Sequence, residues 1–113
     1  MIPFFEGRIG PGMDVLGVRT PDEDYSGILP SLKKKHMDYF HMFYADTALF
    51  SGGYGYECGV KFFGADKVLF ASDSPYSRTG ETIESVERLP ISTSDLKKIM
   101  VGNAEKLLNM KFK

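Results

Sequence analysis

The stretch Val68–Gly80, VLFASDSPYSRTG, joins a buried-strand pattern to a turn that carries a carboxylate. Its first residues are apolar on both faces, which is typical of a strand covered on two sides in a parallel sheet. Asp73 comes where that strand should end, shortly before Pro75. Because the ligand site of parallel β/α folds lies at the carboxyl ends of the strands, Asp73 is the leading candidate for a reactive carboxylate. The alternative is an Asx-type turn or a cap for the next helix.

The segments around this stretch alternate between helical and strand patterns. The expected order is a helix from Leu29, a strand over 43–50, a helix that ends at Gly64, the strand over 67–73, a helix that ends at Pro90 and a final helical region over 91–110. This alternation predicts β/α units with parallel strands, and therefore the α/β class.

The final helical region has explicit start and stop signals. Ser92 and Asp95 have capping-box spacing, with Asp in place of the more usual Glu. Gly102 is placed to end this helix, and Asn103 to cap a further helical turn.

The composition is that of one ordinary globular domain, with 113 residues of which 42% are hydrophobic and 26% charged. Residues 1–27 are rich in Gly, Pro and Asp without a sustained period, which predicts an irregular loop region ahead of the β/α units in 28–113. Two strands make a poor sheet because both edges stay open. We therefore expect a single partial domain over 1–113 that belongs to a larger β/α assembly.

Charge and cysteine content exclude several classes of partner. The net charge of -1 does not favour nucleic acid or an anionic membrane, and Lys33–Lys35 fits a solvated helix face. The single cysteine, Cys58, cannot form an internal disulfide, which suits a reducing compartment. No apolar run approaches the roughly 18 residues that span a bilayer, and a signal-peptide pattern is missing. We expect a cytoplasmic protein.

Arg8 is the candidate for binding an anionic group. It lies in the glycine-containing segment EGRIG, where its guanidinium could clamp a carboxylate with two hydrogen bonds. The alternative is an ordinary ion pair with Glu6 or Asp14.

Other polar residues give weaker signals. Asp46 and Thr47 fit a buried hydrogen-bonding pair within the first strand. His36 and His41 are five residues apart, so on a helix they point about 140° apart and do not form a metal-binding pair. The glycines of GGYGYECG lack the spacing of a dinucleotide fingerprint and the Lys-Ser/Thr of a P-loop. A complete catalytic constellation is not recognisable.

Three phrases resemble one family in order and spacing: FYADTALF (43–50), FFGADKVLFASDSPY (62–76) and DLKKIMVGNAEKLLNM (95–110). They look like the C-terminal third of the amidohydrolase-related metal-dependent decarboxylases and hydrolases, which include the γ-resorcylate and 5-carboxyvanillate decarboxylases. The opening phrase IPFFEGRIG (2–10) resembles the segment after the sixth barrel strand of those enzymes. The resemblance implies a distorted (β/α)8 TIM barrel, to which this chain would contribute the last two β/α units and the C-terminal helices.

The resemblance also implies roles for two residues. Asp73 matches the Asp at the end of the eighth strand, which ligates or adjoins a divalent metal, zinc or manganese, and handles protons. Arg8 matches an Arg that binds the substrate carboxylate, in some members across a dimer interface. The family's metal-binding histidines have no counterpart in this sequence.

These matches lead to one expected function and one alternative. We expect the C-terminal segment of a metal-dependent decarboxylase or hydrolase for a small, aromatic or unsaturated carboxylic acid, a homodimer or higher oligomer that is inactive as this segment alone. The alternative is a non-catalytic self-associating protein or one subunit of a split enzyme.

Overall fold

The computed structural model describes residues 1–16 and 24–112, in two compact units, Met1–Phe43 and Tyr44–Lys113. The first unit consists of short helices: η1 (Ile2–Phe5), α1 (Glu6–Ile9), η2 (Met13–Val15), α2 (Ile28–Ser31) and α3 (His36–Phe40). The described part of 1–27 is thus partly helical where an irregular loop was expected. Pro3 near the start of η1 explains part of this difference, since its fixed φ is suited to a first helical turn. Residues 17–23 lie outside the described part.

The helix predicted from Leu29 is interrupted. Leu32 has an extended backbone with ψ 138°, and a new helix begins at His36. Neither α2 nor α3 has a side-chain cap or a buried residue. Helices this short need tertiary packing for stability, so the periodic pattern alone could not sustain one helix through the three lysines.

The second unit contains two short strands, β1 (Ala45–Asp46) and β2 (Val68–Leu69). They pair in parallel with Ala45 opposite Val68, which confirms the predicted parallel arrangement. Both strands are shorter than predicted. The backbone after β2 forms its hydrogen bonds with a helix carbonyl and a threonine side chain instead of with a neighbouring strand.

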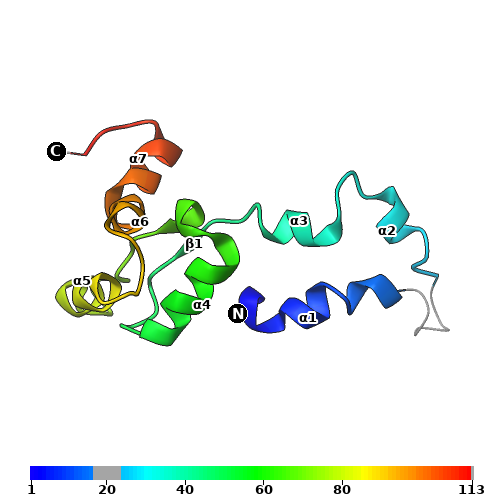
Figure 1. Cartoon of the computed structure of the whole chain (residues 1–113), viewed down its shortest axis with the longest axis horizontal. Coiled ribbons are helices and arrows are strands. Elements are labelled where there is room, and N and C mark those ends of the chain that lie inside the picture. Colours follow the sequence, from blue (N-terminus) through cyan, green and yellow to red (C-terminus); the bar gives the residue numbers. More distant parts are fainter. Residues whose placement is uncertain (17–23, 113) are drawn as a thin grey trace. The chain divides into compact units, whose positions relative to one another are not determined.

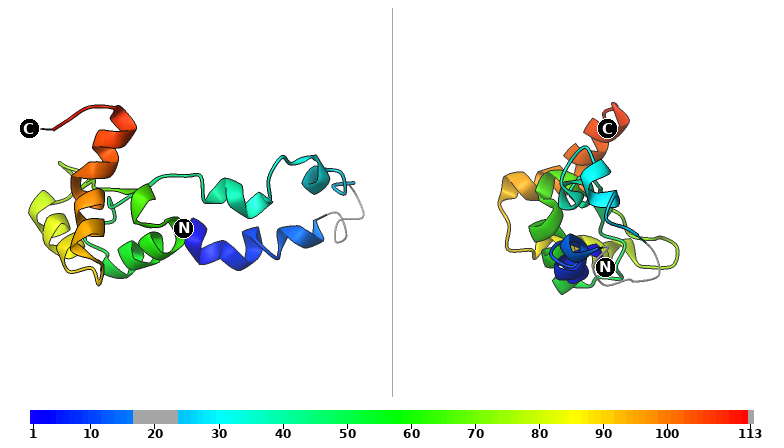
Figure 2. Two further views of the ribbon diagram at one scale, coloured as in Figure 1. Left: turned by 45° about the horizontal axis from the view of Figure 1, so that its top comes forward. Right: turned by 90° about the vertical axis from the view of Figure 1, so that its right-hand side faces the viewer.

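Helices lie around these strands in Figures 1 and 2. They are α4 (Gly53–Phe63), η3 (Ala65–Lys67), α5 (Thr79–Glu87), α6 (Thr93–Lys97), η4 (Lys98–Gly102) and α7 (Asn103–Leu108). Gly64 ends α4 with φ 80°, a left-handed conformation that favours glycine, as predicted from its position.

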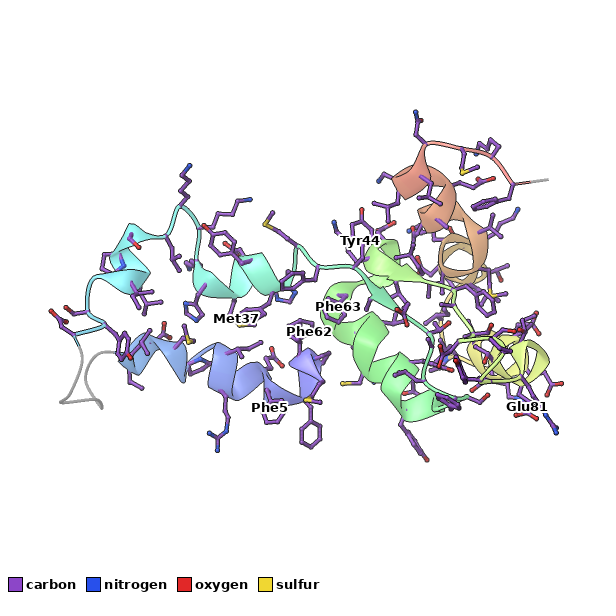
Figure 3. All side chains as sticks on the ribbon, turned by 180° about the vertical axis from the view of Figure 1, so that it is seen from behind. Phe5, Met37, Tyr44, Phe62, Phe63 and Glu81 are labelled. Carbon is purple, nitrogen blue, oxygen red and sulfur yellow. The ribbon has the colours of Figure 1, made fainter. Side chains whose placement is uncertain are left out.

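The hydrophobic core joins β2 to the helices α4, α5 and η4 and to the segment after α5. It consists of Tyr56, Val68, Val86, Leu89 and Ile99, all in the second unit. One face of α4 contributes to it, because Val60 and Phe63 pack against this core beside the buried Tyr56. Figure 3 labels Phe63 on α4.

The C-terminal helical region is one continuous run from Thr93 to Leu108, with a π-helical segment, η4, in its middle. Ser92 caps it as predicted, since its hydroxyl accepts the backbone N–H of Asp95 at 3.0 Å. The predicted stop at Gly102 is wrong, because Gly102 is helical with φ -60° and ψ -37°. The run ends at Asn109 with φ 51°. None of the described helices is long and apolar enough to cross a membrane.

Candidate functional site

The loops that follow β1 and β2 contain backbone conformations that are uncommon for residues other than glycine. Phe50, Ser51 and Asp73 have φ values of 48°, 63° and 62°. Left-handed residues of this kind concentrate at functional sites, where the surrounding structure holds them. Both loops leave the carboxyl ends of parallel strands, which is the ligand-binding end of β/α folds.

Asp73 itself makes the turn with its backbone and leaves its side chain free. Its carbonyl oxygen accepts the N–H groups of Tyr76 and Ser77 at 2.9 and 3.1 Å. The carboxylate is exposed and has no hydrogen-bond or ion-pair partner among the described residues. The next helix, α5, has Arg78 at its N-cap and no side-chain cap. Neither an Asx-type turn nor a cap therefore accounts for the Asp73 carboxylate.

Thr47 connects the two strands just before Asp73. Its side chain is fully buried, and its hydroxyl donates to the carbonyl oxygen of Ala71 at 2.8 Å while accepting the Ala71 N–H at 3.0 Å. This threonine thereby extends the pairing of β1 and β2 by side-chain hydrogen bonds. The predicted buried pair is right for Thr47 and wrong for Asp46, which is exposed and accepts the Ala48 N–H at 2.9 Å.

The other edge of β2 is held by the C-terminal helix. The Asn103 amide nitrogen donates to the carbonyl oxygens of Ala65 and Val68 at 2.6 and 2.7 Å, and the side chain is buried. The Phe70 N–H donates to the Ile99 carbonyl oxygen at 2.9 Å. The expectation of two open sheet edges is thus wrong here. The predicted role of Asn103 as a helix cap is therefore wrong, because its side chain hydrogen-bonds to distant backbone carbonyls instead.

Arg8 lies in α1 of the first unit and is exposed. Neither of the predicted alternative partners forms an ion pair with it in the described part of the chain, and Asp14 lies 3.8 Å from His36 instead. The backbone winds closely past Arg8, because a Cβ atom added at Gly12 would come within 2.3 Å of the Arg8 carbonyl oxygen. The guanidinium is therefore available to a ligand.

His36 makes contacts that hold the first unit together. The Nε2–H of His36 donates to the carbonyl oxygen of Gly10 at 2.9 Å. Met37, labelled on α3 in Figure 3, lies with its sulfur 3.3 Å from a Cβ added at Gly10. This packing makes His36 part of the contact between α3 and the segment after α1.

Charged groups of the C-terminal helix have shifted pKa values. Hydrogen bonds from Lys98 and Ser92 lower the pKa of Asp95, and the hydrogen bonds to Asp95 and Asp66 raise the pKa of Lys98. A hydrogen bond from Lys111, followed by one from the backbone of Phe112, lowers the pKa of Glu105. These interactions fix the helix and its tail.

Neither the surface hollow of the C-terminal helix nor the potential metal ligands among the described residues form a ready-made site at Asp73. A surface hollow of about 400 Å³ is lined by residues 102–111, including Glu105 and Lys111, which already pair with each other at 2.9 Å. Across residues 1–16 and 24–112, no group of three or more His, Cys, Asp or Glu side chains is placed to hold a metal ion.

Comparisons with known proteins agree on one family. The sequence model described as Amidohydrolase matches residues 18–110. A γ-resorcylate decarboxylase from Polaromonas sp. is 34% identical over 82 residues, which are 69% of this chain and 24% of that protein.

Solved structures give the same result. The dihydroxybenzoic acid decarboxylase from Polaromonas sp. JS666, solved with manganese and the inhibitor 2-nitroresorcinol, is 28% identical with a TM-score of 0.73, over 96% of this chain and 30% of that one. The 5-carboxyvanillate decarboxylase from Sphingomonas paucimobilis is 22% identical with a TM-score of 0.78, over 97% of this chain and 31% of that one. The predicted fold class, part of an amidohydrolase-type TIM barrel, is confirmed. The chain spans about a third or less of the length of these proteins.

Proposed function

The chain belongs to the amidohydrolase family, and from that premise we propose that it is a segment of a metal-dependent decarboxylase for a small aromatic carboxylic acid. The observation that carries the proposal is the exposed, unpartnered carboxylate of Asp73, held in a left-handed turn at the carboxyl end of β2. Two relatives support this proposal, since they are named as decarboxylases of γ-resorcylate and of dihydroxybenzoic acid, which are aromatic carboxylic acids.

Asp73 is the proposed proton donor. In the proposed step, the protonated Asp73 carboxyl gives its proton to the ring carbon that carries the substrate carboxylate. The bond between that carbon and the carboxylate carbon then breaks, its electron pair returns to the ring, and CO2 leaves. The substrate loses one negative charge and Asp73 gains one, so the charge balances. A positioned acid of this kind contributes about 10²- to 10⁴-fold to a rate.

Arg8 is the proposed binding residue for the substrate carboxylate. A guanidinium presents two parallel N–H donors that match the two oxygens of a carboxylate, which gives both attraction and orientation. The exposed side chain of Arg8, without an ion-pair partner among the described residues, supports this role.

A divalent metal, zinc or manganese, belongs to the proposed enzyme as a whole. Catalytic zinc sites take about three protein ligands, and the described residues of this chain do not fit such a site, since no three candidate ligands come together. Asp73 is proposed as one ligand or near neighbour of that metal. We therefore expect no turnover from this chain alone.

Self-association and a cytoplasmic location complete the proposal. Large apolar side chains are exposed in both units, among them Phe4 at 86% and Tyr54 at 92%. Exposed apolar groups of this size favour a homodimer or higher oligomer, and a single monodisperse monomer in light scattering would contradict it. The exposed free thiol of Cys58 suits a reducing compartment.

A chimera tests the decarboxylase proposal. Residues 18–110 replace the matching segment of the Polaromonas γ-resorcylate decarboxylase, and CO2 release from 2,6-dihydroxybenzoate is measured with Mn²⁺. Asp73→Asn should lower kcat by about 10²-fold or more, whereas the matched control Asp46→Asn should leave it within about twofold, because the Asp46 side chain accepts only the nearby Ala48 N–H among the described residues and asparagine keeps that acceptor oxygen. Equal activity of the two variants would rule out Asp73 as proton donor.

A further inference from the structure

Strand β2 is hydrogen-bonded on both edges over the residues that lead to Asp73. On one edge, the carbonyl oxygen of Leu69 accepts the Thr47 N–H at 3.1 Å and Ala71 binds the Thr47 hydroxyl. On the other edge, the Val68 carbonyl and the Phe70 N–H are bound by the C-terminal helix. Four consecutive residues of β2 and its extension are thus fixed before the chain turns.

The π-helical segment η4 supplies one of these helix contacts. The Asn103 N–H donates to the Lys98 carbonyl five residues earlier, instead of to the Ile99 carbonyl four residues earlier. The Ile99 carbonyl oxygen is left without that helical donor and accepts the Phe70 N–H at 2.9 Å. π-Bulges of this kind occur frequently at functional sites.

The Asn103 side chain supplies the other contact, and its chemistry suits the task. A primary amide nitrogen carries two N–H donors, and the Asn103 nitrogen reaches two carbonyl oxygens, those of Ala65 and Val68. Aspartate has the same shape without these donors. At this buried position its carboxylate would face two carbonyl oxygens and leave them unpaired.

We propose that Asn103, together with the Ile99 carbonyl, is the positioning residue for Asp73. The Asp73 carboxylate has no partner of its own among the described residues, so its location is set by the backbone that precedes it. That backbone is fixed to the C-terminal helix by Asn103 at Val68 and by Ile99 at Phe70. The inference rests on the proposed function, in which Asp73 is the reacting group.

The first test uses side-chain hydrogen exchange in the unmodified chain. The sequence contains two asparagines and no glutamine, so NMR shows only the side-chain amide pairs of Asn103 and Asn109. Asn109 is exposed at the end of α7. The Asn103 amide protons should exchange at least tenfold more slowly than those of Asn109. Equal exchange rates would overturn the proposal.

The second test compares Asn103→Asp with the matched control Asn109→Asp. Asn103→Asp should accelerate backbone exchange at Phe70 at least tenfold more than at Val86, which lies in the core on α5. It should also move the ¹³Cγ resonance of Asp73 in the metal-free chain. Asn109→Asp should change neither. If backbone exchange accelerates equally at Phe70 and Val86 and the Asp73 resonance does not move, Asn103 only stabilises the fold in general. That result would overturn the proposal.

A second pair of variants covers the case in which Asn103→Asp does not fold. Where Asn103→Asp does not fold, Asn103→Ser and Asn109→Ser replace the pair, because a serine hydroxyl keeps a donor that cannot reach both carbonyls. None of these readouts uses metal or turnover. The decarboxylase proposal is tested by CO2 release from the chimera. The Asn103 proposal is tested separately by the exchange rates and by the Asp73 resonance, so the failure of one can be told from the failure of the other.

Discussion

At the scale of single residues, Asp73 occupies a conformation that glycine would adopt more easily. Its φ of 62° lies in the left-handed region, and its carboxylate makes no hydrogen bond among the described residues. We predict that Asp73→Gly raises the free energy of unfolding by about 0.5–1 kcal/mol, because a left-handed residue with a Cβ costs about 1–2 kcal/mol, partly offset by the greater freedom of glycine when unfolded. Asp73→Ala, which keeps a Cβ, should give no gain.

Urea unfolding of the three chains checks this prediction. A loss of stability in Asp73→Gly would mean that the carboxylate supports the turn, which is the structural interpretation of VLFASDSPYSRTG. A gain would mean that the carboxylate is retained for another reason, as expected for a reacting group.

Gly12 offers a second prediction at this scale. A Cβ added at Gly12 would meet backbone atoms of Arg8, with the carbonyl oxygen at 2.3 Å. Gly12→Ala must therefore displace the turn behind Arg8 and should cost about 1–3 kcal/mol where that turn is formed. Gly7→Ala is the matched control, because nothing lies within 4 Å of a Cβ there.

Amide hydrogen exchange at Gly12 and Met13, whose N–H groups donate to Gly7 and Gly10, measures the effect of both variants. Faster exchange in Gly12→Ala, together with slower or unchanged exchange in Gly7→Ala, is expected. Equal exchange in both variants would contradict a requirement for glycine at position 12.

At the scale of elements, the run from Thr93 to Leu108 should depend on pH through its charged hydrogen bonds. The pKa of Asp95 is lowered mainly by its hydrogen bond with Lys98, and that of Glu105 mainly by Lys111. A lowered pKa in the folded chain means that the stabilisation is present above the ordinary carboxyl pKa of about 4 and is lost as the pH falls through the folded value. The raised pKa of Lys98 acts in the opposite sense, at alkaline pH.

We therefore predict that helicity and unfolding free energy decline below about pH 4, with a shallower decline in Asp95→Asn. Glu105 should retain its own contribution in that variant. Circular dichroism with urea at pH 3 to 7 provides the measurement, and Asp46→Asn, which removes a carboxylate from β1 instead of from this helix, is the control. An identical pH profile for Asp95→Asn and the parent chain would contradict the prediction.

Some features of the helices and strands could be predicted from the sequence, and others could not. Ser92 as N-cap and Gly64 as a helix end were predictable, because each depends on local chemistry that the residue itself supplies. The continuation of the helix through Gly102 was not, because a tertiary contact, the binding of Asn103 to Ala65 and Val68, overrides a weak local preference. The predicted strand lengths were wrong for the same reason. The N–H groups of Ala71 and Phe70 bind the Thr47 hydroxyl and the Ile99 carbonyl oxygen instead of a neighbouring strand.

In the candidate site too, features that depend on local sequence were predictable and features that depend on tertiary contacts were not. The position of Asp73 at the carboxyl end of a strand could be predicted from sequence, because an apolar strand followed by a carboxylate has a known place in β/α folds. The absence of local hydrogen bonds to the Asp73 carboxylate among the described residues could not be predicted, because an Asx-type turn has the same sequence signature. The two hydrogen bonds of the Asn103 side chain could not be predicted either, since their acceptors lie 38 and 35 residues away along the chain.

At the scale of the whole molecule, the order of the elements predicted the α/β class, and the resemblance of three phrases to one family implied part of a TIM barrel. The division into two units did not, because it depends on where the core forms. All five core residues lie in the second unit, whereas Gly10 is the one buried residue among those described in the first. The hydrophobic driving force for folding is therefore concentrated in residues 44–113.

This distribution predicts that residues 44–113 fold cooperatively without the first unit, and that residues 1–43 alone do not. Cores of this size supply at most about 3–5 kcal/mol, so one core substitution should decide the outcome. Ile99→Ala removes a fully buried side chain and costs about 2–5 kcal/mol, which should abolish the transition of the isolated segment. Val101→Ala, on the same helix but 42% exposed, should leave the transition in place. Urea titrations followed by circular dichroism measure both. If the two variants unfold alike, the stability does not reside in the core described here.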